Sequence, residues 1–327
     1  MISINNIKKS YGKTPALKGV SFEVHEGELF GLIGPDGAGK TSLLRILMSL
    51  LLPDSGTATM NGYDVEKEYK QVRLHTGYMP GRFSLYPDLT VEENMEFFAT
   101  VFGTTIQENY DLVKDIYSQI EPFKTRRAGK LSGGMKQKLA LSCALIHKPD
   151  ILILDEPTTG VDAVSRKEFW EMLRRLKAQG ITILVSTPYM DEATLCDRIA
   201  LIQDGEIFSI ETPQKMMADF NEDLWSVRSS STLYQTAKLL QDLSGIISVN
   251  SFGHSLHLVT PKGKITQAEI LSFLKNQGQT EIELEPVTAT VEDVFMLFMQ
   301  KNSTQPSPEE GEMDKLKQNK NNELNIN

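Results

Sequence analysis

A segment near the N-terminus places glycines, a lysine and a threonine at the spacing that phosphate chemistry requires. The apolar run Leu29–Ile33 before it predicts a buried strand, and Ser42–Leu47 after it predicts a helix. Glycines let backbone N–H groups surround a phosphate, and a helix N-terminus favours an anion. The sequence therefore predicts a loop that binds a nucleoside triphosphate. Its expected contact residues are Gly34, Pro35, Asp36, Gly37, Ala38, Gly39, Lys40, Thr41 and Ser42.

Two carboxylates follow a second apolar run further along the chain. Ile151–Leu154 predicts a buried strand, and Asp155 and Glu156 stand at its end. Lys40 would bring a positive charge to the β- and γ-phosphates, while Thr41 and Asp155 would hold Mg²⁺ from opposite sides. Glu156 is placed to polarise the water that attacks the γ-phosphate. The predicted catalytic residues are therefore Glu156 and Lys40.

A second glycine-containing segment, Leu131–Gln137, opens a helical stretch. Ser132, Gly133 and Gly134 would form an anion-binding nest at the N-terminus of that helix. Because one nucleotide rarely needs two γ-phosphate nests, we expect this nest to serve a nucleotide held by another subunit.

Together these segments resemble the motifs of ABC ATPases, and they occur in the order of that family. Gly34–Thr41 matches the Walker A loop, and Ile151–Glu156 matches the Walker B strand with its catalytic glutamate. Leu131–Gln137 is similar to the family's signature motif, and Thr159–Asp162 is similar to its D-loop. Tyr11 matches the aromatic residue that stacks on adenine, an interaction worth about 1–3 kcal/mol.

The resemblance covers residues 1 to about 215 and implies ATP and Mg²⁺ as ligands. It also implies a head-to-tail dimer in which each ATP lies between Walker A of one subunit and Ser132–Gly134 of the other. In that family ATP closes the dimer and hydrolysis reopens it.

The chain departs from the family pattern at two positions. Gly81 stands where a glutamine is expected, and Pro188 stands where a histidine is expected. Neither replacement has a side chain that can hydrogen-bond, and losing one such contact commonly costs about 10²–10³ in rate. Either Glu156, Lys40 and Mg²⁺ suffice, with Arg82 or Tyr189 filling the gaps, or hydrolysis is slow and a partner sets the cycle. The intact Glu156 favours a working but atypical ATPase.

Composition narrows the class of protein. The chain has 327 residues, of which 24% are charged and 40% hydrophobic, as in ordinary globular domains. A net charge of −9 argues against a nucleic-acid partner. No apolar run approaches the roughly 18 residues that span a bilayer, and the N-terminus has no signal pattern. Because the two cysteines, Cys143 and Cys196, form no disulfide framework, we expect a protein that is cytoplasmic or peripheral on the cytosolic face of the cell membrane.

The pattern of apolar runs predicts an α/β fold of the P-loop NTPase type over residues 1–218, with an inserted helical subdomain at about 88–147. A small α+β ferredoxin-like domain is expected at 222–300, because its strands and helices follow the order βαββαβ before a final helix. The composition of 301–327 predicts a disordered tail.

The glycine-loop and signature sequences further resemble the ATP-binding subunits of ABC-2-type multidrug exporters, as does the region around Thr290–Phe295. That resemblance implies integral-membrane ABC-2 permease subunits and a second ATPase subunit as partners, with Phe83–Thr90 contacting the permease. Three alternatives stay open: a polysaccharide or lipid exporter, a non-transport ABC protein, and an ATP-operated clamp with attenuated hydrolysis. The sequence leaves open the transported substrate and the choice between a homodimer and a heterodimer.

Overall fold

The computed structural model of the chain describes residues 1–303. The tail expected at 301–327 lies outside the described residues except for its first positions, which end the helix α10 (Val291–Ser303). Nowhere in residues 1–303 is there a helix with the length and apolar character needed to cross a membrane.

Contacts within the chain divide it into two units, Met1–Pro213 and Gln214–Asn327. The helix α7 (Pro213–Ala218) begins at the division. The ranges 1–218 and 222–300 remain a prediction of where independent domains begin and end.

A six-stranded sheet is the centre of the first unit. Its strands are β3 (Leu29–Ile33), β6 (Thr76–Met79), β7 (Ile151–Asp155), β8 (Thr182–Thr187), β9 (Arg198–Gln203) and β10 (Glu206–Glu211). They lie in the order β10-β9-β3-β8-β7-β6, all parallel except the antiparallel edge strand β10. Every residue of β3, β7 and β8 is buried, which is typical of parallel strands covered on both faces.

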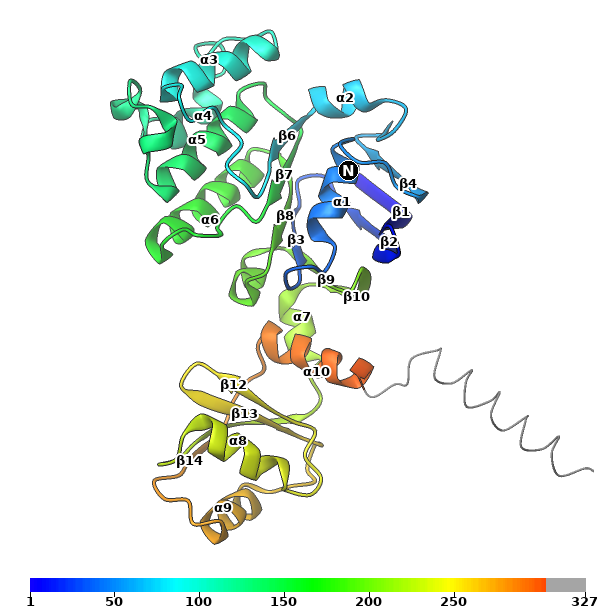
Figure 1. Cartoon of the computed structure of the whole chain (residues 1–327), viewed down its shortest axis with the longest axis vertical. Helices are drawn as coiled ribbons and strands as arrows, with labels where there is room; N and C mark the ends of the chain where they lie inside the picture. Colours follow the sequence, from blue (N-terminus) through cyan, green and yellow to red (C-terminus); the bar gives the residue numbers. More distant parts are fainter. Residues whose placement is uncertain (304–327) are drawn as a thin grey trace, which may run out of the picture. The chain divides into compact units, whose positions relative to one another are not determined.

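Helices cover both faces of this sheet (Figure 1). On one face α1 (Lys40–Leu47) shares a hydrophobic cluster with alternate strand residues, Leu32 and Ile153 among them. On the other face α6 (Ala163–Ala178) packs against β3 and β8. Because successive side chains of a strand point to opposite faces of the sheet, alternate residues of each strand face α1.

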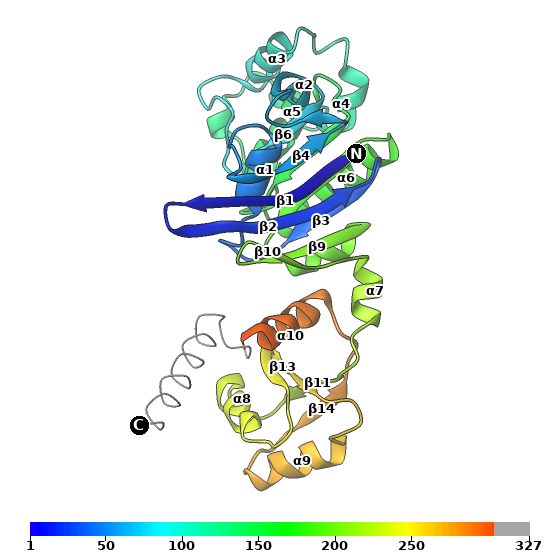
Figure 2. The same ribbon diagram turned by 90° about the vertical axis from the view of Figure 1, so that its right-hand side faces the viewer.

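An antiparallel sheet completes the cluster around α1. Its strands are β1 (Ile2–Tyr11), β2 (Thr14–Val24), β4 (Ser55–Met60) and β5 (Tyr63–Asp64), in the order β2-β1-β4-β5. Figure 2 shows β1 and β2 as a long hairpin, and its buried side chains, such as Ile4 and Phe22, join the α1 cluster. This hairpin carries Tyr11 at its tip.

Between β6 and β7 the chain is helical. This segment contains α3 (Val91–Val101), α4 (Tyr110–Tyr117) and α5 (Gly133–Leu145), and it follows the short α2 (Tyr69–Leu74) that precedes β6. Both α3 and α4 pack against α5, and α5 also packs against β6. The Thr90 and Glu93 side chains form a capping box that starts α3.

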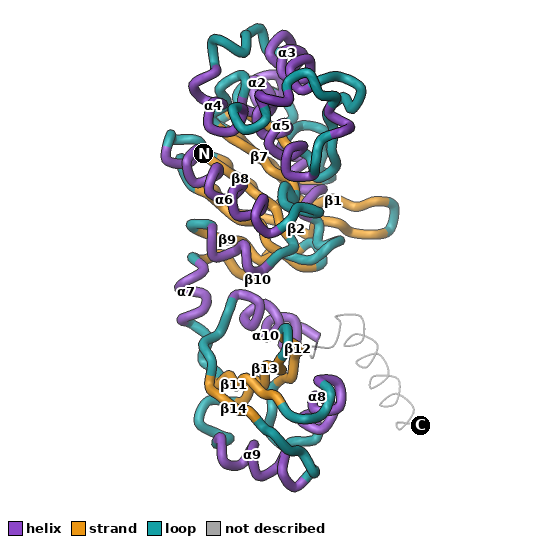
Figure 3. The backbone as a smooth tube through the Cα atoms, turned by 90° about the vertical axis from the view of Figure 1, so that its left-hand side faces the viewer, coloured by secondary structure: helices purple, strands orange, loops and turns teal. Residues whose placement is uncertain are grey.

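The second unit contains an antiparallel sheet between two layers of helix. Its elements are β11 (Asp223–Arg228), α8 (Leu233–Gln241), β12 (Ser248–Phe252), β13 (Ser255–Thr260), α9 (Gln267–Asn276), β14 (Glu283–Pro286) and α10. The strand order is β12-β13-β11-β14, and Figure 3 shows α10 on one side of this sheet and α8 and α9 on the other. Leu258 therefore packs with α8 and α9, while its neighbour Val259 packs with α10.

These two architectures confirm the predicted fold class, an α/β nucleotide-binding fold with a helical insertion and a ferredoxin-like α+β unit. One strand begins later than expected. The predicted strand Glu281–Leu284 lies at Glu283–Pro286, because Glu281 has φ +50°, which lies in the left-handed region and outside the extended range of a regular strand.

Candidate nucleotide site

The glycine-rich loop follows β3 and leads into α1, and its backbone explains its glycines. A Cβ at Gly34 would lie 2.1 Å from the Ile202 carbonyl oxygen, and a Cβ at Gly39 would lie 2.4 Å from the Ala16 carbonyl oxygen. Gly39 also has φ +102°, which L side chains rarely adopt. Only glycine fits at either position, so the tight curve of this loop depends on both.

Lys40 is the first residue of α1 and is only 3% exposed. Its Nζ donates hydrogen bonds to the carbonyl oxygens of Gly34 (2.7 Å) and Pro35 (2.9 Å). The same nitrogen lies 3.1 Å from Glu156 Oε1. The structure thus brings the two predicted catalytic side chains into one ion pair beside the loop.

Asp155 ends β7 and is 2% exposed. Its Oδ1 accepts hydrogen bonds from Thr41 Oγ1 (3.2 Å) and Ser186 Oγ (2.7 Å). A carboxylate and a hydroxyl within hydrogen-bond distance are a suitable oxygen pair for Mg²⁺, which usually takes one or two carboxylates and completes its shell with waters and phosphates. The predicted metal-binding residues therefore fit that ion.

Glu156 adopts an unusual backbone conformation, with φ +49°. Its N–H donates to both the carbonyl oxygen (3.0 Å) and the Oγ (3.1 Å) of Ser186, at the end of β8. Residues held in such conformations often lie at functional sites, where the surroundings compensate for the strain. Ser186 was not predicted from the sequence, and its place two residues before Pro188 was the one signal that pointed to this site.

Tyr11 and Ser42 meet at the entrance to the loop. The Tyr11 hydroxyl lies 3.3 Å from Ser42 Oγ, and Tyr11 is 50% exposed. The hairpin of the antiparallel sheet therefore brings an exposed aromatic ring to the start of α1.

The signature segment lies at the N-terminus of α5. Ser132 caps that helix, its Oγ accepting a hydrogen bond from the Met135 N–H (3.3 Å), and both Ser132 and Gly133 are exposed. Gly134 is buried against α6, where a Cβ would lie 2.7 Å from Ser165 Oγ. In the described part of the chain, no hydrogen bond or ion pair joins these residues to the glycine loop, so the structure does not bring the two nests together.

The two departures from the family pattern lie close to this site. A Cβ at Gly81 would be 3.1 Å from the Asp155 carbonyl oxygen, so a side chain there would start beside the metal-binding residue. Gly81, Arg82 and Glu156 line one cavity of about 170 Å³. The ring of Tyr189 lies 4.5 Å from the Arg166 guanidinium, an interaction that already occupies its face.

The Asp155 carboxylate also influences Tyr78, which stands two residues before Pro80. Burial, together with the negative charge of Asp155, raises the pKa of Tyr78 to about 12, although Arg45 opposes this shift. The phenol is therefore neutral at physiological pH and adds no charge beside Asp155.

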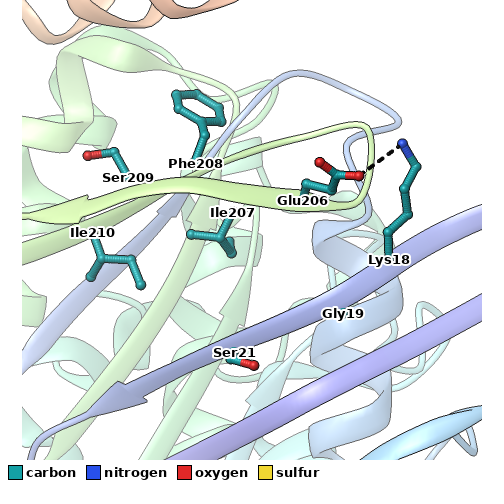
Figure 4. Close-up of a pocket in the computed structure, with 8 residues that line it drawn as sticks. All are labelled: Lys18, Gly19, Ser21, Glu206, Ile207, Phe208, Ser209 and Ile210. Atoms are coloured by element: carbon teal, nitrogen blue, oxygen red, sulfur yellow. Dashed lines mark ion pairs between the residues drawn. The ribbon is translucent and has the colours of Figure 1, made fainter. Parts of the chain in front are cut away.

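A larger cavity of about 540 Å³ lies elsewhere, between β2 and β10 (Figure 4). The ion pair of Lys18 and Glu206, 3.5 Å long, stands at one end of it. Its lining is Lys18, Gly19, Ser21, Glu206, Ile207, Phe208, Ser209 and Ile210. None of the predicted nucleotide-binding residues belongs to this lining.

Comparisons with known proteins identify the family of the chain. The sequence model of the ABC transporter family matches residues 17–159. The chain is 37% identical over 318 residues to the probable multidrug ABC transporter ATP-binding protein YbhF of Escherichia coli, covering 94% of this chain but 54% of that protein. This chain thus spans about half the length of that relative.

Two other relatives are covered more fully. The Nod factor export ATP-binding protein I of Burkholderia lata is 41% identical over 219 residues, covering 66% of this chain and 72% of that protein. The linearmycin resistance ATP-binding protein LnrL of Bacillus subtilis is 35% identical over 257 residues, covering 78% of this chain and 80% of that protein.

Solved structures share the fold of the first unit. CbiO1 of Clostridium perfringens, part of an ABC transporter complex, has a TM-score of 0.60 and 25% identity, covering 67% of this chain and 90% of that one. The ATP-binding cassette MJ0796, solved as a dimer bound to ADP and phosphate, has a TM-score of 0.59 and 28% identity. The match covers 65% of this chain and 98% of that one. The glycine loop, the Asp155–Glu156 strand end and these relatives lead to one conclusion: the chain belongs to the ABC transporter family, among its ATP-binding ATPases.

Proposed function

We propose that this chain is the ATP-hydrolysing subunit of an ABC-2-type exporter and that it powers the efflux of drugs or related compounds through a membrane permease. The observation that carries the proposal is the cluster of Lys40, Thr41, Asp155 and Glu156 around one glycine loop. The printed names of the relatives, which refer to multidrug transport, Nod factor export and linearmycin resistance, support the direction of transport.

Each residue of the cluster has a distinct part in the proposed reaction. Lys40 neutralises charge on the β- and γ-phosphates, and exchanging its loop carbonyl partners for phosphate oxygens costs it no hydrogen bonds. Mg²⁺, held by Thr41 and Asp155, would offset the charge that develops on the phosphate oxygens. Glu156 accepts a proton from the attacking water, and the two hydrogen bonds that its N–H donates to Ser186 fix the backbone that carries the carboxylate.

The exposed nucleotide-facing groups support a dimer. Tyr11 would stack on the adenine, and the exposed N-terminus of α5 at Ser132 and Gly133 would contact the γ-phosphate bound by another subunit. The cassette MJ0796 was solved as a dimer, which supports a dimer for this chain as well. Whether the second ATPase subunit is a copy of this chain or a different protein is left to experiment.

A hydrophobic groove supports the proposed permease partner. It has a volume of about 390 Å³ and lies between the helical insertion and the end of β6. Beside it the segment Phe83–Thr90 exposes Phe83 and Tyr86, and the Tyr86 ring packs edge-on against exposed Phe97. Exposed aromatic side chains around an apolar groove are typical of protein docking surfaces. We therefore propose that the permease binds here and holds the chain on the cytosolic face of the membrane.

Glycine at 81 and proline at 188 favour one second candidate, an ATP-operated clamp that hydrolyses slowly. The two candidates share the nucleotide site and differ only in turnover. A polysaccharide or lipid exporter differs in substrate alone, and the chain's own contacts do not favour it.

Steady-state hydrolysis of Mg²⁺-ATP by the purified chain tests the proposal, with Glu156→Gln as the matched control. We expect measurable turnover that falls at least about 100-fold in Glu156→Gln, because the Glu156 carboxylate is the proposed general base. ATP binding by both proteins shows that the site is intact. Turnover that is equal in both would contradict the proposed role of Glu156, and binding without turnover in either would favour the clamp.

A further inference from the structure

Behind the nucleotide site lies a buried carboxylate that no predicted motif includes. Glu192 belongs to the 3-10 helix Met190–Leu195, which follows β8, and it is 2% exposed. Burying a charge is costly unless it is paired and hydrogen-bonded, so a carboxylate in this position needs a compensating interaction.

Three donors supply that compensation. Glu192 Oε1 accepts hydrogen bonds from Thr158 Oγ1 (2.7 Å) and Arg166 Nε (3.1 Å). Glu192 Oε2 accepts one from Thr187 Oγ1 (2.6 Å). Thr158 and Thr187 are both buried, at 1% and 0% exposed, so neither hydroxyl has water as an alternative partner.

Both threonines are close in sequence to the residues that carry the proposed chemistry. Thr158 is two residues after Glu156. Thr187 directly follows Ser186, the residue that bonds both Asp155 and the Glu156 N–H. Glu192 therefore joins the segment that follows β7, which begins with Glu156, to the end of β8.

The hydrogen bonds of Glu192 also shape the turn at Pro188. Thr187 Oγ1 donates to Glu192 and also accepts a hydrogen bond from the Tyr189 N–H (3.1 Å), which spans the proline. Arg166 contacts the Tyr189 ring while it pairs with Glu192. One carboxylate thus holds the turn in which the family's histidine is missing.

We propose that Glu192 is a positioning residue for hydrolysis: it fixes the Glu156 backbone and the Pro188 turn relative to each other through Thr158 and Thr187. The inference rests on the proposed role of Glu156. Small displacements of a reacting group cost large factors in rate. The hydrogen bonds of Glu192 to Thr158, Thr187 and Arg166 do not reach the glycine loop or α1, the elements proposed to bind the phosphates. Loss of the carboxylate should therefore lower kcat and leave ATP affinity unchanged.

Glu192→Gln is the first variant, because it keeps the size of the side chain and removes its charge. We expect kcat to fall about tenfold while the Kd for ATP stays within about twofold. The matched control is Asp191→Asn, the adjacent acid, which is 74% exposed and pairs with the same Arg166 at 3.0 Å. It should leave both constants unchanged.

Thr187→Val and Thr187→Ser provide a test that does not depend on the folding of Glu192→Gln. Valine keeps the shape and removes the donor, whereas serine keeps the hydroxyl. We expect Thr187→Val to lower kcat and Thr187→Ser to restore most of it, with circular dichroism showing that both fold. Wild-type kcat in a folded Glu192→Gln, or a loss of ATP affinity as large as the loss of kcat, would overturn the inference.

Glu156→Gln in the same assay separates this inference from the proposed function. If turnover is lost in Glu156→Gln but unchanged in Glu192→Gln, the positioning role alone is overturned. If turnover persists in Glu156→Gln, the proposed role of Glu156 in hydrolysis is overturned, and the positioning role of Glu192 with it. If the wild-type chain binds ATP without any turnover, hydrolysis by this chain as the proposed function is overturned instead.

Discussion

At the scale of single residues, the notable feature is what surrounds Asp155. Its carboxylate binds the Thr41 and Ser186 hydroxyls, and Gly81 lies against its backbone. Glutamine and histidine at positions 81 and 188 would add hydrogen-bonding side chains to a site in which Glu156 and Lys40 already form an ion pair.

Restoring both side chains shows whether the site is attenuated. We expect Gly81→Gln combined with Pro188→His to change turnover by less than about tenfold, because the general base, the lysine and the metal-binding pair are already in place. Steady-state hydrolysis measures this, and Gly81→Ala isolates the steric effect of a Cβ 3.1 Å from the Asp155 carbonyl oxygen. A rise of about 100-fold would identify the natural chain as a slow clamp instead.

Sequence patterns predicted the residues that belong to recognisable motifs, whether their partners are near or, as for Thr41 and Asp155, 114 positions away. The glycine loop was predictable because strand, turn and helix are contiguous, and the pairing of Thr41 with Asp155 followed from the same motifs. Ser186 and Glu192 were not predictable, because their partners come from other strands and helices and meet them only in the folded sheet. The late start of β14 escaped prediction for a local reason, the positive φ of Glu281.

At the scale of elements, one side chain shapes the proposed permease surface. Asn94, in α3, is 0% exposed, and its Oδ1 accepts a hydrogen bond from the Tyr86 N–H (3.0 Å). Its Nδ2 donates to the carbonyl oxygens of Tyr86 (3.0 Å) and Thr90 (2.9 Å). The segment before α3 thus takes its shape from an amide on the helix that follows it.

Asn94→Ala should loosen this segment. The Tyr86 N–H would lose its partner, whereas the carbonyl oxygens of Tyr86 and Thr90 would keep the Leu89 and Asn94 N–H groups. A buried group left unsatisfied costs about 1–3 kcal/mol, and the partial exposure of this segment places the loss at the lower end of that range. We expect a lower free energy of unfolding in urea and faster amide hydrogen exchange across residues 83–90. Glu96→Ala, at an exposed position on the same helix, is the control and should change neither measurement. Unchanged exchange in Asn94→Ala would show that the segment is held by other contacts.

At the scale of the whole molecule, the proposed nucleotide site needs two surfaces that no hydrogen bond or ion pair joins among residues 1–303. The glycine loop and Tyr11 form one surface, and the exposed N-terminus of α5 forms the other, while Glu156 and Gly133 line one cavity. A second subunit that faces the first head to tail would join them, and ATP would then lie between positive helix ends on both sides.

Light scattering after size exclusion tests this arrangement on Glu156→Gln, which should hold ATP without turning it over. We expect ATP to shift its mass from the 36.6 kDa of one chain to twice that value. Adding Ser132→Arg should prevent the shift without weakening ATP binding, because Ser132 is exposed and the bond that its side chain accepts is from the Met135 N–H of its own helix, a cap worth about 1 kcal/mol. Ser118→Arg, at an exposed serine elsewhere in the helical insertion, should still dimerise. A dimer that survives Ser132→Arg would place the interface on another surface, whereas a Glu156→Gln chain that binds ATP yet stays monomeric would indicate that the second subunit is a different protein.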